Sequence, residues 1–315
     1  MEYFLALIAI GIAVGFLSGL LGVGGGFILV PLQYFLFMSL GVSPDLALKL
    51  ALGTSFVIIC PTAFFTTYNH YKTKKFNLKP GIILGIFGII GSFIGSLIAI
   101  YLPYHILETL LGLTFILLAI NMFYSSFKNE KTIKSNDNVN GVGGSAVSSV
   151  NDNGISNVND NGISNGIDSV NEMNINIFQI GLLGLVIGLF SGLFSLGGGA
   201  FLIPTLTLLI GLSMISAIRI SSVFITITSI GGILSYLING LFVKTIEYSV
   251  GYINLINFIV ITIFAIGLTA LGTKMAYRVN DRVLKILFSI FIVYMGLKLL
   301  GFDPFILIFN SFLAF

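Results

Sequence analysis

The chain has no tryptophan, a single cysteine and two histidines, and only 9% of its 315 residues are charged. The single cysteine, Cys60, excludes a disulfide within the chain and leaves no cysteine pair for zinc or an iron–sulfur cluster. By contrast, 56% of the residues are hydrophobic and the mean hydropathy is +1.05. This composition is far more apolar than that of a water-soluble domain. It predicts a membrane protein with no bound cofactor or metal.

Apolar runs recur along the chain and are separated by short polar loops. Many approach the roughly 20 residues that cross a bilayer as a helix. We therefore predict an all-α integral membrane protein, a helical bundle. The predicted segments are 3–21, 27–40, 46–68, 78–102 and 106–127, followed by 177–196, 200–212, 215–237, 248–271 and 283–300.

Residues 128–176 interrupt this pattern. They are rich in Asn, Ser, Gly and Asp, and the octapeptide VNDNGISN occurs twice in tandem within them. Such a composition cannot bury an apolar core, so it predicts a flexible linker. The expected organisation is a first transmembrane repeat at 1–127, a cytoplasmic linker at 128–176 and a second transmembrane repeat at 177–315.

The two membrane regions share a sequence motif. GFLSGLLGVGGG, which begins at residue 15, matches GLFSGLFSLGGG, which begins at residue 188, without a gap, and a proline follows each glycine run at the same offset. Farther on, Lys49 matches Arg219. Two copies of one ancestral unit explain these matches. Each copy would contain four to five membrane segments and one Gly-Gly-Gly helix break.

The basic residues predict how the two copies lie in the membrane. Eleven of the fifteen Lys and Arg residues fall within 72–79, 128–134 and 274–285. Cytoplasmic loops retain such residues. The basic loop of the first copy precedes its fourth segment, whereas that of the second copy follows its fourth segment. The copies must then insert in opposite orientations, as inverted repeats of the kind common among secondary transporters.

The glycine runs are the first candidate for a binding site. Three consecutive glycines are a poor way to continue a helix, because each costs about 1 kcal/mol relative to alanine. If the helix breaks there, new helices start near Phe27 and Ala200, and helix N-termini attract anions. The alternative is that the glycines only allow close helix packing. The candidate residues are Gly24, Gly25, Gly26 and Pro31 in the first copy and Gly197, Gly198, Gly199 and Pro204 in the second.

The second candidate is the pair of matched basic residues, Lys49 and Arg219. An ionisable side chain inside a membrane segment is costly and indicates function by default. Helical spacing places Ser222, Thr226 and Ser229 on the side of Arg219, as a polar stripe. Alternatively, both basic side chains reach out to the interface. The nearby hydroxyl pairs Thr54–Ser55 and Ser221–Ser222 complete the candidate substrate-binding set.

At these motifs the chain resembles the sulfite exporter TauE/SafE family of membrane transporters. The resemblance rests on Gly22-x-Gly24-Gly25-Gly26-x4-Pro31, on the stretch Ala51-Leu-Gly53-Thr54-Ser55, and on Gly197-Gly198-Gly199-x4-Pro204. The second copy departs from the pattern with Arg219-Ile-Ser221-Ser222. The resemblance implies secondary-active transport, by alternating access, of sulfite, an organosulfonate or a related sulfur-containing anion.

Several other functions are compatible with parts of the sequence. A passive anion channel would share the same membrane features. An intramembrane serine protease would use a serine of the Ser-Gly pairs at 18–19 and 191–192, but no histidine lies deep in a segment to act as its base. The sequence thus predicts that the chain is not an enzyme. Its expected partners are a small anion, a coupling ion such as H⁺ and the lipid of the plasma membrane, and nucleic acid is not expected.

Overall fold

The computed structural model describes residues 2–21, 24–73, 75–117, 119–120, 177–208, 212, 214–243, 245–276, 289, 293–294 and 296–301. Within these ranges the chain is almost entirely helical, which confirms the predicted all-α membrane fold. The predicted linker and most of the predicted segment 283–300 lie outside the described residues. The helices are α1 (Glu2–Leu21), α2 (Gly26–Ser39), α3 (Pro44–Thr73), α4 (Lys79–Tyr101), a helix at Tyr104–Leu117, α7 (Ile177–Phe194), α8 (Gly199–Leu208), α9 (Met214–Gly240) and α10 (Leu255–Ala276).

Five described helices are long and apolar enough to span a membrane: α1, α3, α4, α9 and α10. Burial divides them into two groups. In α3 and α9, 72% of the most apolar stretch is buried, against 33–44% in the other three. The two helices therefore form the centre of the bundle, while α1, α4 and α10 present much of their surface to lipid.

One predicted segment is partly wrong. The apolar stretch 248–271 is not helical from its start, because α10 begins only at Leu255. The preceding residues form a hairpin of two short antiparallel strands, β1 (Ser249–Val250) and β2 (Ile253–Asn254). Gly251 in the connecting turn has a φ of 61°, a left-handed conformation that glycine adopts without steric cost. Apolar composition alone could not distinguish this hairpin, of which only β2 is buried, from the first turns of a helix.

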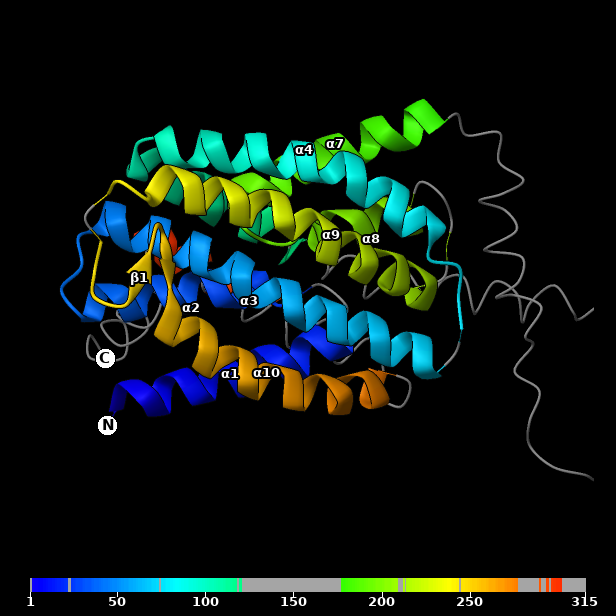
Figure 1. Cartoon of the computed structure of the whole chain (residues 1–315), viewed down its shortest axis with the longest axis horizontal. Coiled ribbons are helices and arrows are strands. Elements are labelled where there is room, and N and C mark those ends of the chain that lie inside the picture. The colour runs from blue at the N-terminus through cyan, green and yellow to red at the C-terminus, as the bar shows by residue number, and fades with distance from the viewer. Residues whose placement is uncertain are drawn as a thin grey trace, which may run out of the picture.

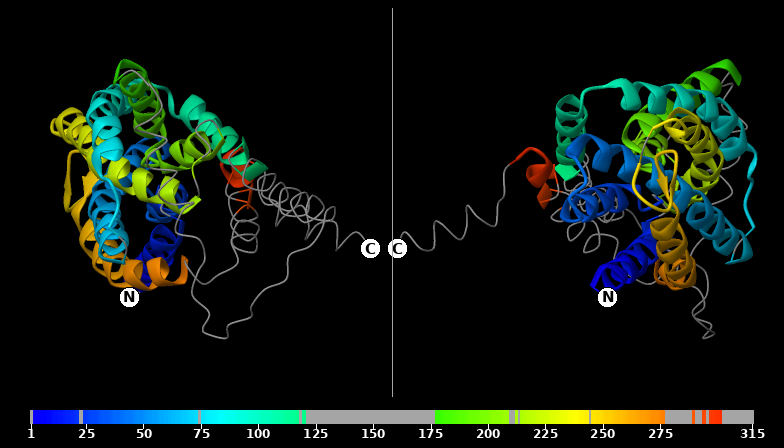
Figure 2. Two further views of the ribbon diagram at one scale, coloured as in Figure 1. Left: turned by 90° about the vertical axis from the view of Figure 1, so that its right-hand side faces the viewer. Right: turned by 60° about the vertical axis from the view of Figure 1, so that its left-hand side comes forward.

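The outer helices pack across the two halves of the sequence. In the first pair, α1 lies along α10, and Gly15 and Gly19 bring it into backbone contact with Ala265 and Thr269. In the second pair, α7 lies along α4 through glycines at the same four-residue spacing. Small residues at this spacing allow such close approach in membranes. The two pairs occupy opposite edges of the bundle, with α3 and α9 between them (Figures 1 and 2).

Corresponding helices of the two halves run in opposite directions (Figure 1). Helices α1, α3 and α10 run one way along the bundle, and α4, α7 and α9 run the other way. The loop between α3 and α4 and the end of α10, which carry predicted cytoplasmic lysines, lie at the same end of the bundle. We propose from these directions that the halves are inverted repeats in the membrane.

The side on which each loop lies can be measured by labelling single cysteines in a Cys60→Ala background. Lys75→Cys and Lys274→Cys, both at exposed positions, should react only with reagent supplied from the cytoplasmic side. Phe242→Cys, at the opposite end and 97% exposed, should react only from the other side. Labelling of positions 75 and 274 from opposite sides would exclude the inverted arrangement.

Candidate functional site

Each glycine run separates two helices: α1 from α2 in the first half, and α7 from α8 in the second. Gly24 and Gly25 have φ angles of 77° and 72°, and Gly197 and Gly198 have angles of 72° and 76°. Left-handed backbone of this kind favours glycine, because a β-carbon would be strained there. The two left-handed glycines of each run therefore reverse the chain, and a new helix can start inside the bundle.

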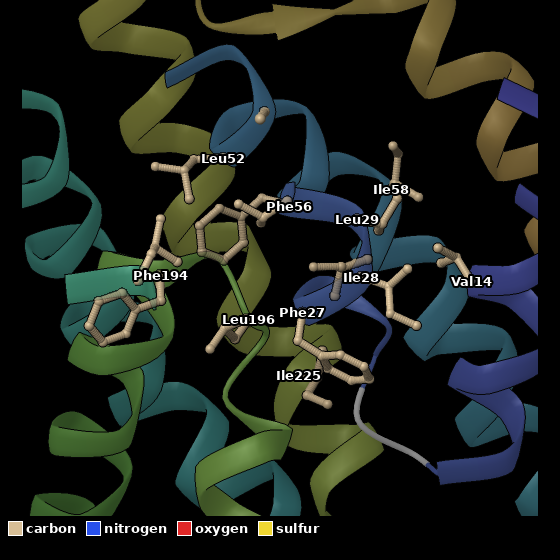
Figure 3. Close-up of a cluster of buried hydrophobic side chains, with 14 of the residues drawn as sticks. Val14, Phe27, Ile28, Leu29, Leu52, Phe56, Ile58, Phe194, Leu196 and Ile225 are labelled. Atoms are coloured by element: carbon tan, nitrogen blue, oxygen red, sulfur yellow. The ribbon is translucent and has the colours of Figure 1, made fainter. Parts of the chain in front are cut away.

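The two breaks lie against each other. A β-carbon on Gly26 would lie 2.6 Å from the carbonyl oxygen of Ser195 and 2.9 Å from the Cα of Leu196, which both belong to the break of the other half. Figure 3 shows Phe27 and Leu196 side by side at this place. Helices α2 and α8 thus start close together, between α3 and α9, which accounts for the need for glycine at position 26.

Each new helix presents its N-terminus to this region. The first helical hydrogen bonds run from the N–H groups of Ile28 and Leu29 to Gly25, and from those of Phe201 and Leu202 to Gly198. The earliest N–H groups of a helix have no acceptor within it and carry a partial positive charge. Two such ends that meet inside the protein favour a negatively charged ligand between them.

A buried serine lies beside the break between α7 and α8. The β-carbon of Ser191 lies 3.2 Å from the position that a β-carbon on Gly198 would take. Its counterpart in the sequence repeat is Ser18. Both serines are fully buried, and neither hydroxyl has a hydrogen-bond partner among the described residues. A buried hydroxyl without a partner is energetically costly, and a bound ligand that accepted its hydrogen bond would remove that cost.

A cluster of buried hydrophobic side chains lies around the breaks (Figure 3). The neighbouring side chains are Val14, Phe27, Ile28, Leu29, Leu52, Phe56, Ile58, Phe194, Leu196 and Ile225. In such surroundings the low dielectric strengthens the attraction between helix N-termini and an anion. Within the described residues, no group of three or more His, Cys, Asp or Glu side chains could hold a metal ion.

The prolines that follow the glycine runs lie inside the new helices. Pro31 is in α2 and Pro204 is in α8. Proline has no N–H and cannot donate the helical bond to the residue four positions earlier. Pro31 and Pro204 therefore each remove one helical hydrogen bond near the start of α2 and α8. Their participation in substrate binding stays a prediction.

Arg219 is enclosed by protein. Its exposed fraction is 3%, and its guanidinium carbon lies 5.7 Å from the centre of the Phe76 ring, in the loop between α3 and α4. His70, near the end of α3, is also buried and lies within electrostatic range of Arg219. The side chain therefore does not extend to the surface of the bundle. It occupies the interior near the predicted cytoplasmic end.

Lys49 lies near the opposite end of the bundle, because α3 and α9 run in opposite directions (Figure 1). Its amino group is 2.9 Å from Asp45, one turn earlier on the same helix, and 15% of its side chain is exposed. The structure thus separates the two matched basic residues instead of bringing them together. Lys49 therefore has an ion-pair partner on its own helix, the half-exposed side chain of Asp45.

The hydroxyl pair on α3 holds neighbouring elements. Thr54 accepts a hydrogen bond of 2.9 Å from the backbone N–H of Asn254 in the hairpin, and Ser55 accepts one of 3.1 Å from the side-chain amide of Gln33 in α2. Gln33 is fully buried, and its carbonyl oxygen has no partner among the described residues. We did not identify Gln33 from the sequence. It is the one amide side chain in the predicted apolar segment 27–40, and this signal could have revealed it.

The polar stripe on α9 bonds to its own helix. The hydroxyl of Ser222 donates to the carbonyl of Arg219 at 2.9 Å, that of Thr226 to Ser222 at 2.8 Å, and that of Ser229 to Thr226 at 3.0 Å. Ser221 donates likewise to Ile218. A hydroxyl has one proton, so these groups could donate to an anion only by giving up the helical bond.

Comparisons with known proteins cover most of the chain. The sequence model of the family described as sulfite exporter TauE/SafE matches residues 7–299. A probable membrane transporter protein of Methanocaldococcus jannaschii is 29% identical over 295 residues, which make up 93% of this chain and 94% of that protein. A probable membrane transporter protein of Haemophilus influenzae is 27% identical over 304 residues, or 94% and 98% of the two chains. No solved structure matches the chain. Both glycine runs lie within the matched region.

Proposed function

Because the chain belongs to the sulfite exporter TauE/SafE family, and is a membrane transporter of that type, we propose that it moves a small anion by secondary-active transport with alternating access. The observation that carries the proposal is the meeting of the two helix N-termini inside the bundle. Ser191, which is fully buried and whose hydroxyl has no partner among the described residues, lies beside the break between α7 and α8. These groups are donors, and a small oxyanion would satisfy them.

The substrate class follows from the donors and from the family. Backbone N–H groups and hydroxyls suit an anion with several oxygen acceptors. The family description names sulfite. We therefore propose sulfite, an organosulfonate or a related sulfur-containing anion as the substrate, and a coupling ion such as H⁺ as the source of energy.

A flux screen with purified protein in liposomes tests this proposal. The candidate substrates are sulfite, sulfate, thiosulfate, taurine and sulfoacetate, with chloride as a halide control, each with and without a proton gradient. We expect saturable flux and counter-flow for at least one sulfur-containing anion, accelerated by the gradient. Flux that does not saturate and shows no counter-flow would instead identify a passive channel. No flux of any of these anions would contradict the proposal.

The serines provide a more specific test. Ser191→Ala and Ser18→Ala should each weaken substrate binding roughly tenfold, since a hydrogen bond to a charged group contributes about 1.5 kcal/mol or more. Affinity would be measured by titration of the purified variants with the substrate found in the screen. Ser235→Ala is the matched control, because Ser235 is equally buried and without a partner but lies near the end of α9. Equal affinities for all three variants would remove both serines from the site.

A further inference from the structure

Two isoleucines lie between the glycine breaks. Ile59 comes from α3 and Ile225 from α9. A β-carbon on Gly24 would lie 3.2 Å from a methyl carbon of each of them, and one on Gly197 would lie 2.9 Å from Ile225 and 3.2 Å from Ile59. Each isoleucine therefore contacts both breaks. Ile59 also approaches the position of a β-carbon on Gly26 to 2.8 Å.

At this place α3 and α9, the two most buried spanning helices, contact each other. The thiol of Cys60 lies 3.7 Å from the backbone carbonyl oxygen of Thr226, so the residues that follow the two isoleucines also touch. Along the bundle, one basic residue lies on either side of the two isoleucines. Arg219 precedes Ile225 by six residues, about 9 Å along α9, towards one end, and Lys49 lies near the other end.

We propose that Ile59 and Ile225 form the closed hydrophobic barrier of the transport pathway, and that they must separate for an anion to pass between the glycine breaks. This inference rests on the proposed transport function. The barrier is effective because, while the two isoleucines are packed together, an anion would lose its water among apolar side chains before it could reach the donors of the breaks. A barrier built from one residue of each half can open towards either side.

The double variant Ile59→Ala/Ile225→Ala tests the barrier. It removes the larger part of both side chains while the glycines remain, so water and ions should reach from one side to the other. In liposomes loaded with chloride, with no gradient of coupling ion, we expect efflux at least tenfold faster than in wild type. Ile261→Ala is the control for the volume lost at each position. It removes the same atoms from an equally buried isoleucine of α10, which packs against Gly11 of α1 away from the breaks, and it should not leak.

Cys60 provides a second measurement, for which the single variant Ile225→Ala is sufficient if the double variant folds poorly. Cys60 is the only cysteine in the chain and lies beside the barrier. A charged thiol reagent that does not cross membranes should modify it slowly in wild type and at least tenfold faster in Ile225→Ala. Such a reagent needs a water-filled path, so faster modification reports that the barrier has opened.

The outcomes separate the barrier from the proposed function. Saturable flux in wild type together with no leak and no change at Cys60 in the variants would overturn the barrier alone. A leak and faster modification in the variants, with no flux of any sulfur-containing anion in wild type, would support the barrier and contradict the proposed function. A leak of equal size in Ile261→Ala would also overturn the barrier, because it would show general loosening of the bundle.

Discussion

Arg219→Gln is expected to weaken anion binding by ten- to a hundredfold while the protein still inserts and folds. The guanidinium is buried and lies 5.7 Å from the centre of the Phe76 ring, in the loop at the predicted cytoplasmic end. A charge-assisted hydrogen bond contributes about 1.5 to 3 kcal/mol, which corresponds to this loss. Titration of purified wild type and variant with the transported anion, at matched thermal stability, measures the effect.

Two further variants show whether the effect belongs to this site. Arg219→Lys should recover only part of the affinity, because an ammonium lacks the planar two-pronged donor geometry that suits an oxyanion. Lys49→Gln is the matched control from the other half. Lys49 is paired with a half-exposed Asp45, and such a pair contributes little, so its loss should change affinity by no more than about twofold. Near-equal affinities for all variants would leave the helix N-termini and serines as the binding groups.

The helices and their breaks could be predicted from the sequence for a simple physical reason. A bilayer imposes a length of about 20 apolar residues on each spanning helix, and glycine is costly within a helix, so hydropathy and glycine runs are strong signals. Segments 3–21 and 177–196 coincide with α1 and α7 to within about two residues. The start of the predicted segment 248–271 was wrong because a short apolar hairpin has the same composition as a helix.

The positions of the candidate residues were harder to predict than the helices. Lys49 and Arg219 match in the repeat, and we grouped them in one substrate-binding set. In an inverted arrangement, however, matched residues away from the midplane lie at opposite ends. Only residues near the midplane, such as those of the glycine breaks, can meet. The predicted orientation therefore already implied the separation that the structure shows for this pair.

The contacts across the two halves lie beyond what a single sequence reveals. The sequence predicts a role for Gly26 only as part of a glycine run. The structure shows a separate reason for glycine at this position. Its partners, Ser195 and Leu196, are about 170 residues away in the sequence. Gln33 and Ser55 are a similar case, since neither segment indicates that the amide of one bonds to the hydroxyl of the other. Such pairings depend on the packing of helices, which hydropathy does not encode.

Gly26→Ala is expected to destabilise the protein and abolish transport. The added methyl group would lie 2.6 Å from the carbonyl oxygen of Ser195, 2.8 Å from Ile59 and 2.9 Å from the Cα of Leu196. Two of these atoms are backbone, so they cannot move aside by a change of rotamer. Overpacking of this kind typically costs about 1–3 kcal/mol, or more where backbone must shift. We expect a fall of several degrees in the unfolding temperature and a loss of flux beyond the loss of folded protein.

Gly267→Ala is the matched control for this prediction. Gly267 lies in α10, and a β-carbon there would meet nothing within 4 Å, so the same substitution should leave stability and flux unchanged or slightly improved. The comparison holds the chemistry of the change constant and varies only the neighbours. Wild-type flux in Gly26→Ala would mean that the breaks need not touch for transport to occur. The anion would then bind at one helix N-terminus alone. Of Ser18 and Ser191, only the serine of that half would weaken binding when it is removed.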